Sequence, residues 1–513
     1  MSMVSLAAEY REIQASEILK QIENGEDVNL TDCRIIGEFN LNDINFETVP
    51  NPKYYEYLNK GVSEEDLKPT RINKNLKVVK SNITIYNSTF ENKLDFSNSL
   101  FKKSISFTKV NCKSFANFAG ANFGNKASFK YTVFGNAGAN LGNKVSFKGL
   151  VFGNIAVFCG ATFGDDTNFQ GATFGDGTNF EIATFGNHTN FGGANFGDSV
   201  SCQLATFGDS TNFLGVTFGD KIDFLGANFG NGTLFFGATF TNNTFFSMAT
   251  FKDHTNFGGA TFGDNTVFTL TTFGNYTLFA PILDYIHVVP SNSPFREITT
   301  FGKYTSFEGS TFGYGTSFSG ATFTDTVDFS GTKFNSVSLN GTDFKEMKVN
   351  WDSLESSLVF DGPIYVKLIQ NFRNLEQFED ADAAYYKYRS ESQALKPWFS
   401  FSKLGDIFMC LTCGYGVKPL NTLLAGAGVV LLYSLFYWKR NGISRSTKNN
   451  KMSNQKATFS EAFYFSMITF TTFGNNDWYP KDNFRKWTML ERLLGWLTLS
   501  LFLVTLTRVM IRP

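Results

Sequence analysis

The most regular pattern in the chain is a phenylalanine that recurs at alternating steps of five and six residues, from about residue 80 to residue 279. One copy of the eleven-residue unit reads GATFGDGTNFE, with a small residue two places before each phenylalanine. A fixed internal period is typical of a solenoid. The Thr, Asn and Gly content disfavours helix, and the step differs from the two-residue alternation of a flat sheet. The pattern therefore predicts short stacked coils, with Phe inside and Asn, Asp and Thr facing water.

The unit resembles the pentapeptide-repeat family, in which a central Leu or Phe recurs every five residues. Ala161 and Ala172 are the small residues two positions before Phe163 and Phe174. The resemblance implies a right-handed quadrilateral β-helix. Every second unit carries one extra residue, within FGDxT or FGNxT, and we expect it at a corner where Gly and Asp or Asn tolerate a turn. Two units would then form one coil, and residues 30–347 would form about 14 coils spaced by about 4.8 Å.

Breaks in this rhythm suggest the domain organisation. Residues 1–29 are expected to form an N-terminal helical cap, and residues 30–347 the β-helix. Residues 49–76 and 280–298 interrupt the repeat and are expected to be insertions. Residues 348–418 follow as a helical linker and interfacial segment.

A helix is predicted within this linker, where Asp361 can act as a cap and Pro363 suits the first turn. Its apolar residues share one face, and they are Tyr365, Leu368, Ile369, Phe372 and Leu375. We expect this stripe chiefly to close the open end of the solenoid, because exposed coil edges invite aggregation. A coupling role toward the segment that follows is compatible with it.

Residues 419–513 have the pattern of a membrane domain. Residues 419–438 carry no charge and are long enough to span a bilayer. Residues 487–510 are similar in length and include three charged residues, Glu491 among them. Between them, residues 459–471 are apolar but too short to cross, and the preceding TFSE has the spacing of a capping box. Irregular backbone after such a helix is stable at membrane depth only where it lines a water-filled path or is covered by protein.

This order resembles the tetrameric two-transmembrane pore-loop cation channels of the potassium-channel type. The match lies at YFSMITFTTFGNNDWYP, residues 464–480, where potassium channels carry Thr-Thr-Val-Gly-Tyr-Gly-Asp. The resemblance implies that the pore helix ends at Thr471 and that the filter occupies residues 472–477. Its members would be Thr472, Phe473 and Gly474 in the Thr-Val-Gly places, Asn475 and Asn476 in place of Tyr and the second Gly, and Asp477. Gly495 takes the place of the gating hinge, and the inner gate is expected at Thr505–Val509, with Thr505 and Val509 as its ends.

The implied function is passive transport of monovalent cations by a homotetramer in a lipid bilayer. The filter departs from the potassium pattern at Asn475 and Asn476, which predicts cation selectivity with weak preference for K⁺ over Na⁺. No cofactor or metal is expected beyond the permeant K⁺ or Na⁺. We expect a multi-pass cell-membrane protein with a cytoplasmic β-helix. Residues 439–456 hold six Lys or Arg, however, and the positive-inside rule favours the opposite orientation.

Composition narrows the alternatives. The net charge of −1 over 513 residues does not suggest a nucleic-acid partner. The six scattered cysteines form no disulfide framework, and CLTC at residues 410–413 has no second pair for a metal. The three histidines lie in the rod region and no catalytic pattern accompanies them, so we expect no enzyme. A membrane-anchored β-helical scaffold that binds other proteins stays as the alternative function, although a plain anchor needs no half-length helix between its spans.

The string TTFGN occurs twice, at residues 271–275 inside the repeat and at residues 471–475 in the membrane domain. The string alone therefore says nothing about function. The interpretation rests on its surroundings, which are repeat units in the first copy and a capped short helix between two spans in the second.

Overall fold

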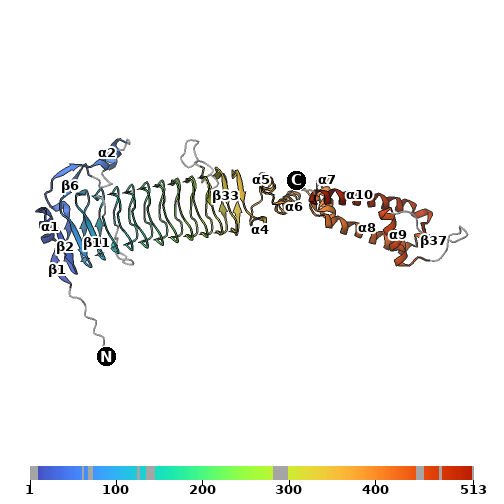
Figure 1. The fold of residues 1–513 in the computed structure, drawn as a ribbon, viewed down its shortest axis with the longest axis horizontal. Helices are drawn as coiled ribbons and strands as arrows, with labels where there is room; N and C mark the ends of the chain where they lie inside the picture. The colour runs from blue at the N-terminus through green and yellow to red at the C-terminus, as the bar shows by residue number, and fades with distance from the viewer. Residues whose placement is uncertain are drawn as a thin grey trace, which may run out of the picture. The chain divides into compact units, whose positions relative to one another are not determined.

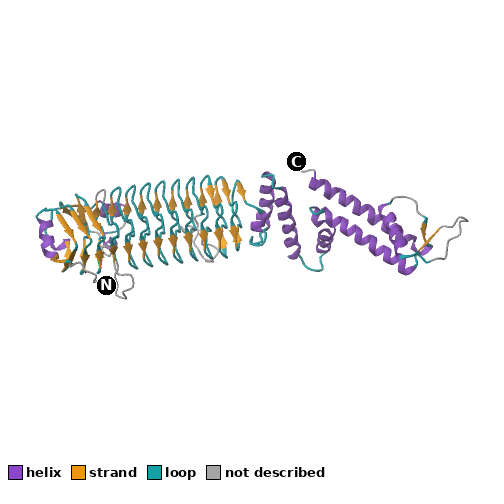
Figure 2. Cartoon of the chain, turned by 60° about the horizontal axis from the view of Figure 1, so that its bottom comes forward, coloured by secondary structure: helices purple, strands orange, loops and turns teal. Residues whose placement is uncertain are grey.

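The computed structural model describes residues 10–59, 63–67, 73–123, 127–134, 145–280, 298–445, 456–472 and 477–510. The chain divides into two compact units, Met1–Asp361 and Gly362–Pro513. The first unit is a stack of short coils, and the second is helical (Figures 1 and 2).

The first unit is a four-sided β-solenoid, as the repeat predicted. One face is a parallel 13-stranded sheet. Its strands are β1 Arg11–Gln14, β3 Cys33–Ile36, β8 Thr89–Phe90, β12 Asn111–Cys112, β15 Val133–Phe134, β17 Thr162–Phe163, β19 Thr184–Phe185, β21 Thr206–Phe207, β23 Asn228–Phe229, β25 Thr250–Phe251, β27 Thr272–Phe273, β30 Thr311–Phe312 and β34 Lys333–Phe334.

A second face is a 12-stranded sheet. Its strands are β5 Thr48–Pro50, β6 Asn75–Val79, β10 Ser99–Phe101, β14 Asn122–Phe123, β16 Val151–Phe152, β18 Thr173–Phe174, β20 Asn195–Phe196, β22 Thr217–Phe218, β24 Thr239–Phe240, β26 Thr261–Phe262, β28 Thr300–Phe301 and β32 Thr322–Phe323.

The other two faces are ladders of short strands continued by single bridges such as Ser128 to Val157 and Asn168 to Asn190. Their strands are β2 Val28–Thr31, β7 Ile83–Tyr86, β11 Ile105–Thr108, β29 Thr305–Ser306, β33 Thr326–Asp328 and β36 Glu346–Lys348 on one face, and β4 Phe39–Asn40, β9 Leu94–Asp95, β13 Ala116–Asn117, β31 Thr316–Ser317 and β35 Val337–Ser338 on the other.

The register gives the length of one coil. Thr162 pairs with Thr184, 22 residues later in the chain. The hydrogen bond between Asp165 and Asn187 at the corner spans the same 22 residues. Two eleven-residue units therefore form one coil, as predicted. The thirteen strands of the first sheet correspond to a stack about 60 Å long at the spacing of neighbouring strands.

The solenoid core is a set of phenylalanine columns. The ring of Phe207 lies 4.9 Å from that of Phe185 in the coil before it and 4.9 Å from that of Phe229 in the coil after it, with interplanar angles of 1° and 4°. These centroid distances equal the spacing between strands, so the rings stack at the spacing that the backbone imposes. Cys202 is buried in a phenylalanine position of this repeat, as the pattern indicated.

The extra residue lies at a corner, but the glycine there serves another purpose than the one predicted. The left-handed residue at this corner is Asp166, with φ 56°. Gly164, two places before it, is not in the left-handed region. A Cβ at Gly186, one coil later, would lie 2.5 Å from the Asp165 nitrogen. This glycine therefore permits close approach of successive coils. The Asp or Asn side chain joins them, since Asp165 Oδ1 accepts from the Asn187 N–H at 2.7 Å.

The interruptions of the solenoid differ in what the structure describes. Residues 1–29 contain the helix α1 Ala15–Glu23, but β1 precedes it and pairs with β3, so this part is not purely helical. The region 49–76 holds α2 Pro52–Asn59 and α3 Glu64–Leu67 after the short η1 Leu41–Asp43, and β5 and β6 pair antiparallel across it. Residues 281–297 lie outside the described residues, and Phe301 resumes the stack at 4.8 Å from Phe262. The unit ends with α4 Trp351–Leu354.

The second unit holds the linker helices and the helices of the membrane domain. Its elements are α5 Gly362–Asn374, α6 Phe378–Ala394, α7 Phe401–Cys413, η5 Gly414–Gly416, α8 Pro419–Arg440, β37 Ile443–Arg445, α9 Phe459–Thr471, β38 Trp478–Pro480, η6 Asp482–Phe484 and α10 Arg485–Met510. The predicted apolar stripe of α5 is largely buried, and α5 packs against α6. Two segments are long and apolar enough to cross a membrane, Pro419–Arg440 and Asp482–Met510.

Candidate pore site

The short helix α9 begins with the capping box that the sequence predicted. The Thr458 hydroxyl accepts a hydrogen bond from the Glu461 N–H at 3.3 Å, and the Thr458 N–H donates to Glu461 Oε2 at 2.8 Å. Two N–H groups that the helix leaves unpaired are thereby satisfied. This fixes where α9 starts and leaves 13 residues before it ends at Thr471.

The helix α9 ends in an unusual backbone conformation. Thr472 has φ 58° and ψ 20°, in the left-handed region, which β-branched residues rarely adopt. Thr471 Oγ1 turns back to donate to the Met467 carbonyl at 2.8 Å. Strained residues of this kind cluster at functional sites. Of the other predicted filter residues, Phe473, Gly474, Asn475 and Asn476 lie outside the described residues.

A pair of antiparallel strands anchors the chain where the structure resumes after these residues. The strand β38 pairs antiparallel with β37, and Arg445 faces Trp478. Trp478 is buried in a cluster with Tyr437, Ile443, Ala457, Ala462 and Phe465. Asp477, the last predicted filter residue, points outward and lies 3.6 Å from the Arg445 guanidinium. Both groups are largely exposed, so this pair contributes little to stability.

A buried carboxyl group joins the three helices. Glu491 of α10 is fully buried. Its Oε2 accepts from the Tyr437 hydroxyl of α8 at 2.8 Å, and its Oε1 accepts from the Ser466 hydroxyl of α9. The Ser466 hydroxyl oxygen also lies 3.0 Å from the Val430 carbonyl oxygen of α8. The sequence showed only a glutamate inside a span. An ionisable residue at membrane depth is by itself a signal of a functional role, and that signal could have identified the position.

Gly495, the predicted hinge, is a contact point between α10 and α9. The helix α10 continues unbroken from Arg485 to Met510. A Cβ at Gly495 would overlap the Phe470 carbonyl oxygen and would lie 2.8 Å from the Phe470 carbonyl carbon. The absence of a side chain therefore lets α10 approach the last turn of α9, two residues before Thr472.

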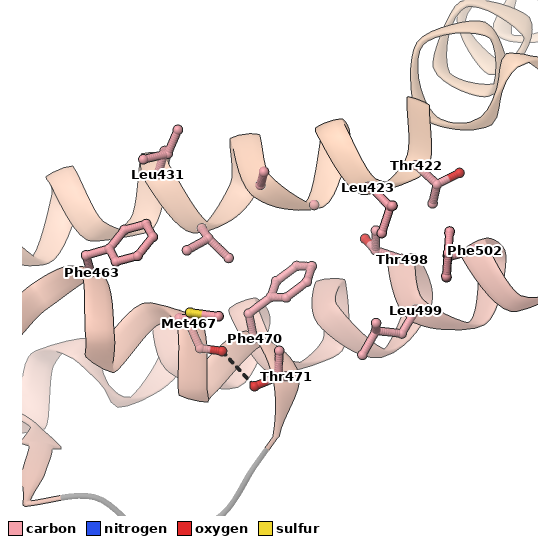
Figure 3. A pocket seen from close by; sticks show the side chains of 13 residues that line it. Thr422, Leu423, Leu431, Phe463, Met467, Phe470, Thr471, Thr498, Leu499 and Phe502 are labelled. Atoms are coloured by element: carbon pink, nitrogen blue, oxygen red, sulfur yellow. Dashed lines mark hydrogen bonds between the residues drawn. The ribbon is translucent and has the colours of Figure 1, made fainter. Parts of the chain in front are cut away.

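The Phe470 ring lies in an apolar pocket between the three helices (Figure 3). The pocket has a volume of about 380 Å³. Its lining residues are Thr422, Leu423, Gly426, Ala427, Val430 and Leu431 of α8, Phe463, Met467, Phe470 and Thr471 of α9, and Thr498, Leu499 and Phe502 of α10. On the α8 side, a Cβ at Gly426 would lie 3.2 Å from Phe470 Cζ. Glycines of α8 and α10 thus both make room for Phe470.

The predicted inner gate lies at the other end of α10. Thr505 is buried, and its hydroxyl donates to the Phe502 carbonyl at 2.9 Å. Val509 is partly exposed. The rise of an α-helix places Thr505 about 15 Å along the axis from Gly495. The structure therefore places Gly495 against α9, and Thr505 and Val509 in the last turns of α10. There the neighbouring Arg508 guanidinium lies 4.9 Å from the centre of the Tyr385 ring of the linker helix α6.

Comparison with known proteins gives two partial matches. Residues 425–512, which include α9, α10 and most of α8, match a family described as ion channels. Residues 293–346, in the last coils of the solenoid, match the family of pentapeptide repeats, nine copies. No curated protein matches the chain. The chain therefore resembles pentapeptide-repeat proteins in its solenoid and ion channels in its C-terminal helices.

Proposed function

We propose that the protein is a homotetrameric channel that conducts monovalent cations, K⁺ and Na⁺, passively across a membrane. The observation that carries this proposal is a capped short helix, α9, that lies between two span-length helices and ends in the strained Thr472. The match of residues 425–512 to ion channels supports the same function.

The filter in this proposal consists of Thr471, Thr472 and residues 473–477. The C-terminal end of a helix carries a partial negative charge that favours a cation. Backbone carbonyls and the Thr472 hydroxyl can replace the hydration shell of the ion. One loop cannot surround an ion, so four chains around a common axis are required. Mass measurement of the protein in nanodiscs should give four copies, and a monomer or dimer would contradict the proposal.

Selectivity follows from the two asparagines. The second glycine of a potassium filter permits a left-handed backbone, which Asn tolerates at a cost. Asn475 also replaces the aromatic residue that follows the first glycine of a potassium filter. We therefore expect cation selectivity with weak preference for K⁺. Bi-ionic recordings with Na⁺ outside and K⁺ inside should give a reversal potential close to zero, and a strongly negative value would contradict the weak preference.

The decisive experiment is planar-bilayer recording of the purified full chain with ion substitution, on matched variants. Thr472→Ala should change the unitary conductance or the reversal potential, because it removes a proposed ion ligand. Thr272→Ala makes the same change in the other copy of TTFGN, at an exposed solenoid position, and should leave both unchanged. Equal effects of the two variants would contradict the assigned filter.

The gate in this proposal lies at Gly495 and at Thr505–Val509, and the β-helix is cytoplasmic and biases it through residues 348–418. Deletion of residues 1–345 should change the open probability without changing unitary conductance. Unaltered gating would limit the solenoid to a scaffold role. Labelling of Asp477→Cys from the extracellular side of sealed cells would support the orientation, whereas labelling only after permeabilisation would reverse it.

A further inference from the structure

The linker helix α7 has its polarity reversed relative to a helix on the surface of a soluble protein. Phe401, Leu404, Phe408 and Leu411 share one face and are 92%, 57%, 61% and 70% exposed. Lys403 and Asp406, on the other face, are only 5% and 8% exposed. In water the arrangement would be the opposite, and a contiguous exposed apolar face of this kind marks an interaction surface.

The buried polar face of α7 is bound to α6 and to the α6–α7 turn. Asp406 accepts from Arg389 of α6 at 2.8 Å and from Lys396 at 2.5 Å. Lys403 donates to the Lys396 carbonyl at 2.8 Å, and its ammonium lies 4.4 Å from the centre of the Trp398 ring. Lys396, and then Arg389, hold the pKa of Asp406 below its usual value. This orients α7 and keeps its apolar face outward.

We propose that α7 lies in the membrane interface with its apolar face in the lipid, and that α6 couples its position to the inner end of α10. The lipid is the expected occupant because of where α7 lies along the chain. It ends at Cys413, and the candidate span α8 begins at Pro419, so α7 cannot leave the membrane boundary. A helix with an apolar face, preceded by Trp398 and with Lys403 in its first turn, is typical of this position.

A chain of contacts leads from α7 to α10. Arg389, which binds Asp406 of α7, also donates to the Tyr385 hydroxyl at 3.1 Å. The Arg508 guanidinium of α10 lies 4.9 Å from the centre of the Tyr385 ring. Arg508 also lies against η5, where a Cβ at Gly416 would be 3.2 Å from its Nη1. Arg508 is three residues beyond Thr505, so displacement of α7 in the interface would move the proposed inner gate.

The lipid contact can be tested without conduction. Spin labels at Leu404→Cys and Phe408→Cys, in the full chain with Cys159→Ser and Cys410→Ser, are measured in phosphatidylcholine–phosphatidylglycerol nanodiscs. Both should be more accessible to oxygen than to a water-soluble nickel chelate. Leu204→Cys, at a solenoid position of similar exposure (59%), should show the reverse. Aqueous accessibility at residues 404 and 408 would overturn the proposal, and so would exclusion of both reagents, which would indicate a protein partner.

The coupling rests on the proposed channel function and is tested by gating. Tyr385→Leu and Arg508→Gln should each change the ratio of open to closed channels by about two- to thirtyfold, the range of a cation–π contact, and the double variant should add little. Tyr385→Phe keeps the ring but loses the hydrogen bond from Arg389, so it should change the ratio less than Tyr385→Leu does. Unchanged gating in a conducting protein would overturn the coupling alone. A wild-type protein that never conducts would instead refute the channel function, and the spin-label result would still decide the position of α7.

Discussion

Gly495→Ala distinguishes a glycine needed for packing from a glycine needed as a hinge. The added Cβ would overlap the Phe470 carbonyl oxygen and would lie 2.8 Å and 3.2 Å from the Phe470 carbonyl carbon and Cα. All three are backbone atoms of α9, so no side chain can rotate away to relieve the contact. The helices α9 and α10 must therefore separate.

The magnitude follows from two opposing effects. Overpacking of a close contact costs about 1–3 kcal/mol, whereas Gly to Ala inside a helix gains up to about 1 kcal/mol. Gly428→Ala in α8 is the matched control, because its Cβ would meet nothing within 4 Å and its helix gain is the same. The difference in free energy between the two variants therefore measures the cost of the overlap alone. We expect about 1–3 kcal/mol, which is about 5- to 150-fold in an equilibrium constant.

Recordings and thermal unfolding both measure this difference. The overlap acts two residues before Thr472, so Gly495→Ala should change the unitary conductance or the reversal potential. It should also lower Tm relative to Gly428→Ala in the same detergent. A glycine that serves only as a hinge would change open probability and leave conductance, selectivity and Tm unchanged. That result, or equal behaviour of the two variants, would refute the packing argument.

Three further predictions concern the solenoid and the linker. Phe229→Ala removes a ring stacked at 4.9 Å and 4.6 Å on its two neighbours and should cost about 3–5 kcal/mol in chemical denaturation, whereas the exposed Leu204→Ala should stay within about 0.5 kcal/mol of the wild type. The pKa of Asp406 is lowered by its cationic partners, so its stabilisation is present above the ordinary aspartate pKa of about 3.9 and is lost below it. Tm measured against pH should show that loss for the wild type but not for Asp406→Asn. Burial raises the pKa of the Cys202 thiol, so maleimide at neutral pH should modify the partly exposed Cys159 and leave Cys202 unmodified until the solenoid unfolds.

The solenoid could be predicted because its signal is local and repeated. The alternation of five and six residues gave the coil of two units, and the pairing of Thr162 with Thr184 confirms it. The reason for the corner glycine could not be predicted, because Gly186 is constrained by the Asp165 nitrogen one coil earlier. A single unit shows that glycine suits a turn, but it does not show how closely the next coil approaches.

The order of the elements in the membrane domain could be predicted from the sequence, but the contacts between its helices could not. Thr458 and Glu461 are three residues apart, so their capping box was visible in the sequence and the structure confirms it. The contacts of Glu491 with Tyr437 and Ser466 join residues 54 and 25 positions apart. No periodicity encodes such a contact, because it depends on how three helices pack.

The two copies of TTFGN show how strongly neighbours determine local structure. In the first copy, Thr272 and Phe273 form β27, which pairs with a strand on each side, and Phe273 stacks at 5.1 Å and 4.5 Å on the coils before and after it. In the second copy, the capping box starts a helix that continues through Thr471, and Thr472 ends it in the left-handed region. Identical residues thus become a strand where adjacent coils supply backbone partners, and a helix end where a cap upstream starts a helix. The proposal that the second copy binds ions therefore depends on α9 and Gly495, which position that helix end, rather than on the string itself.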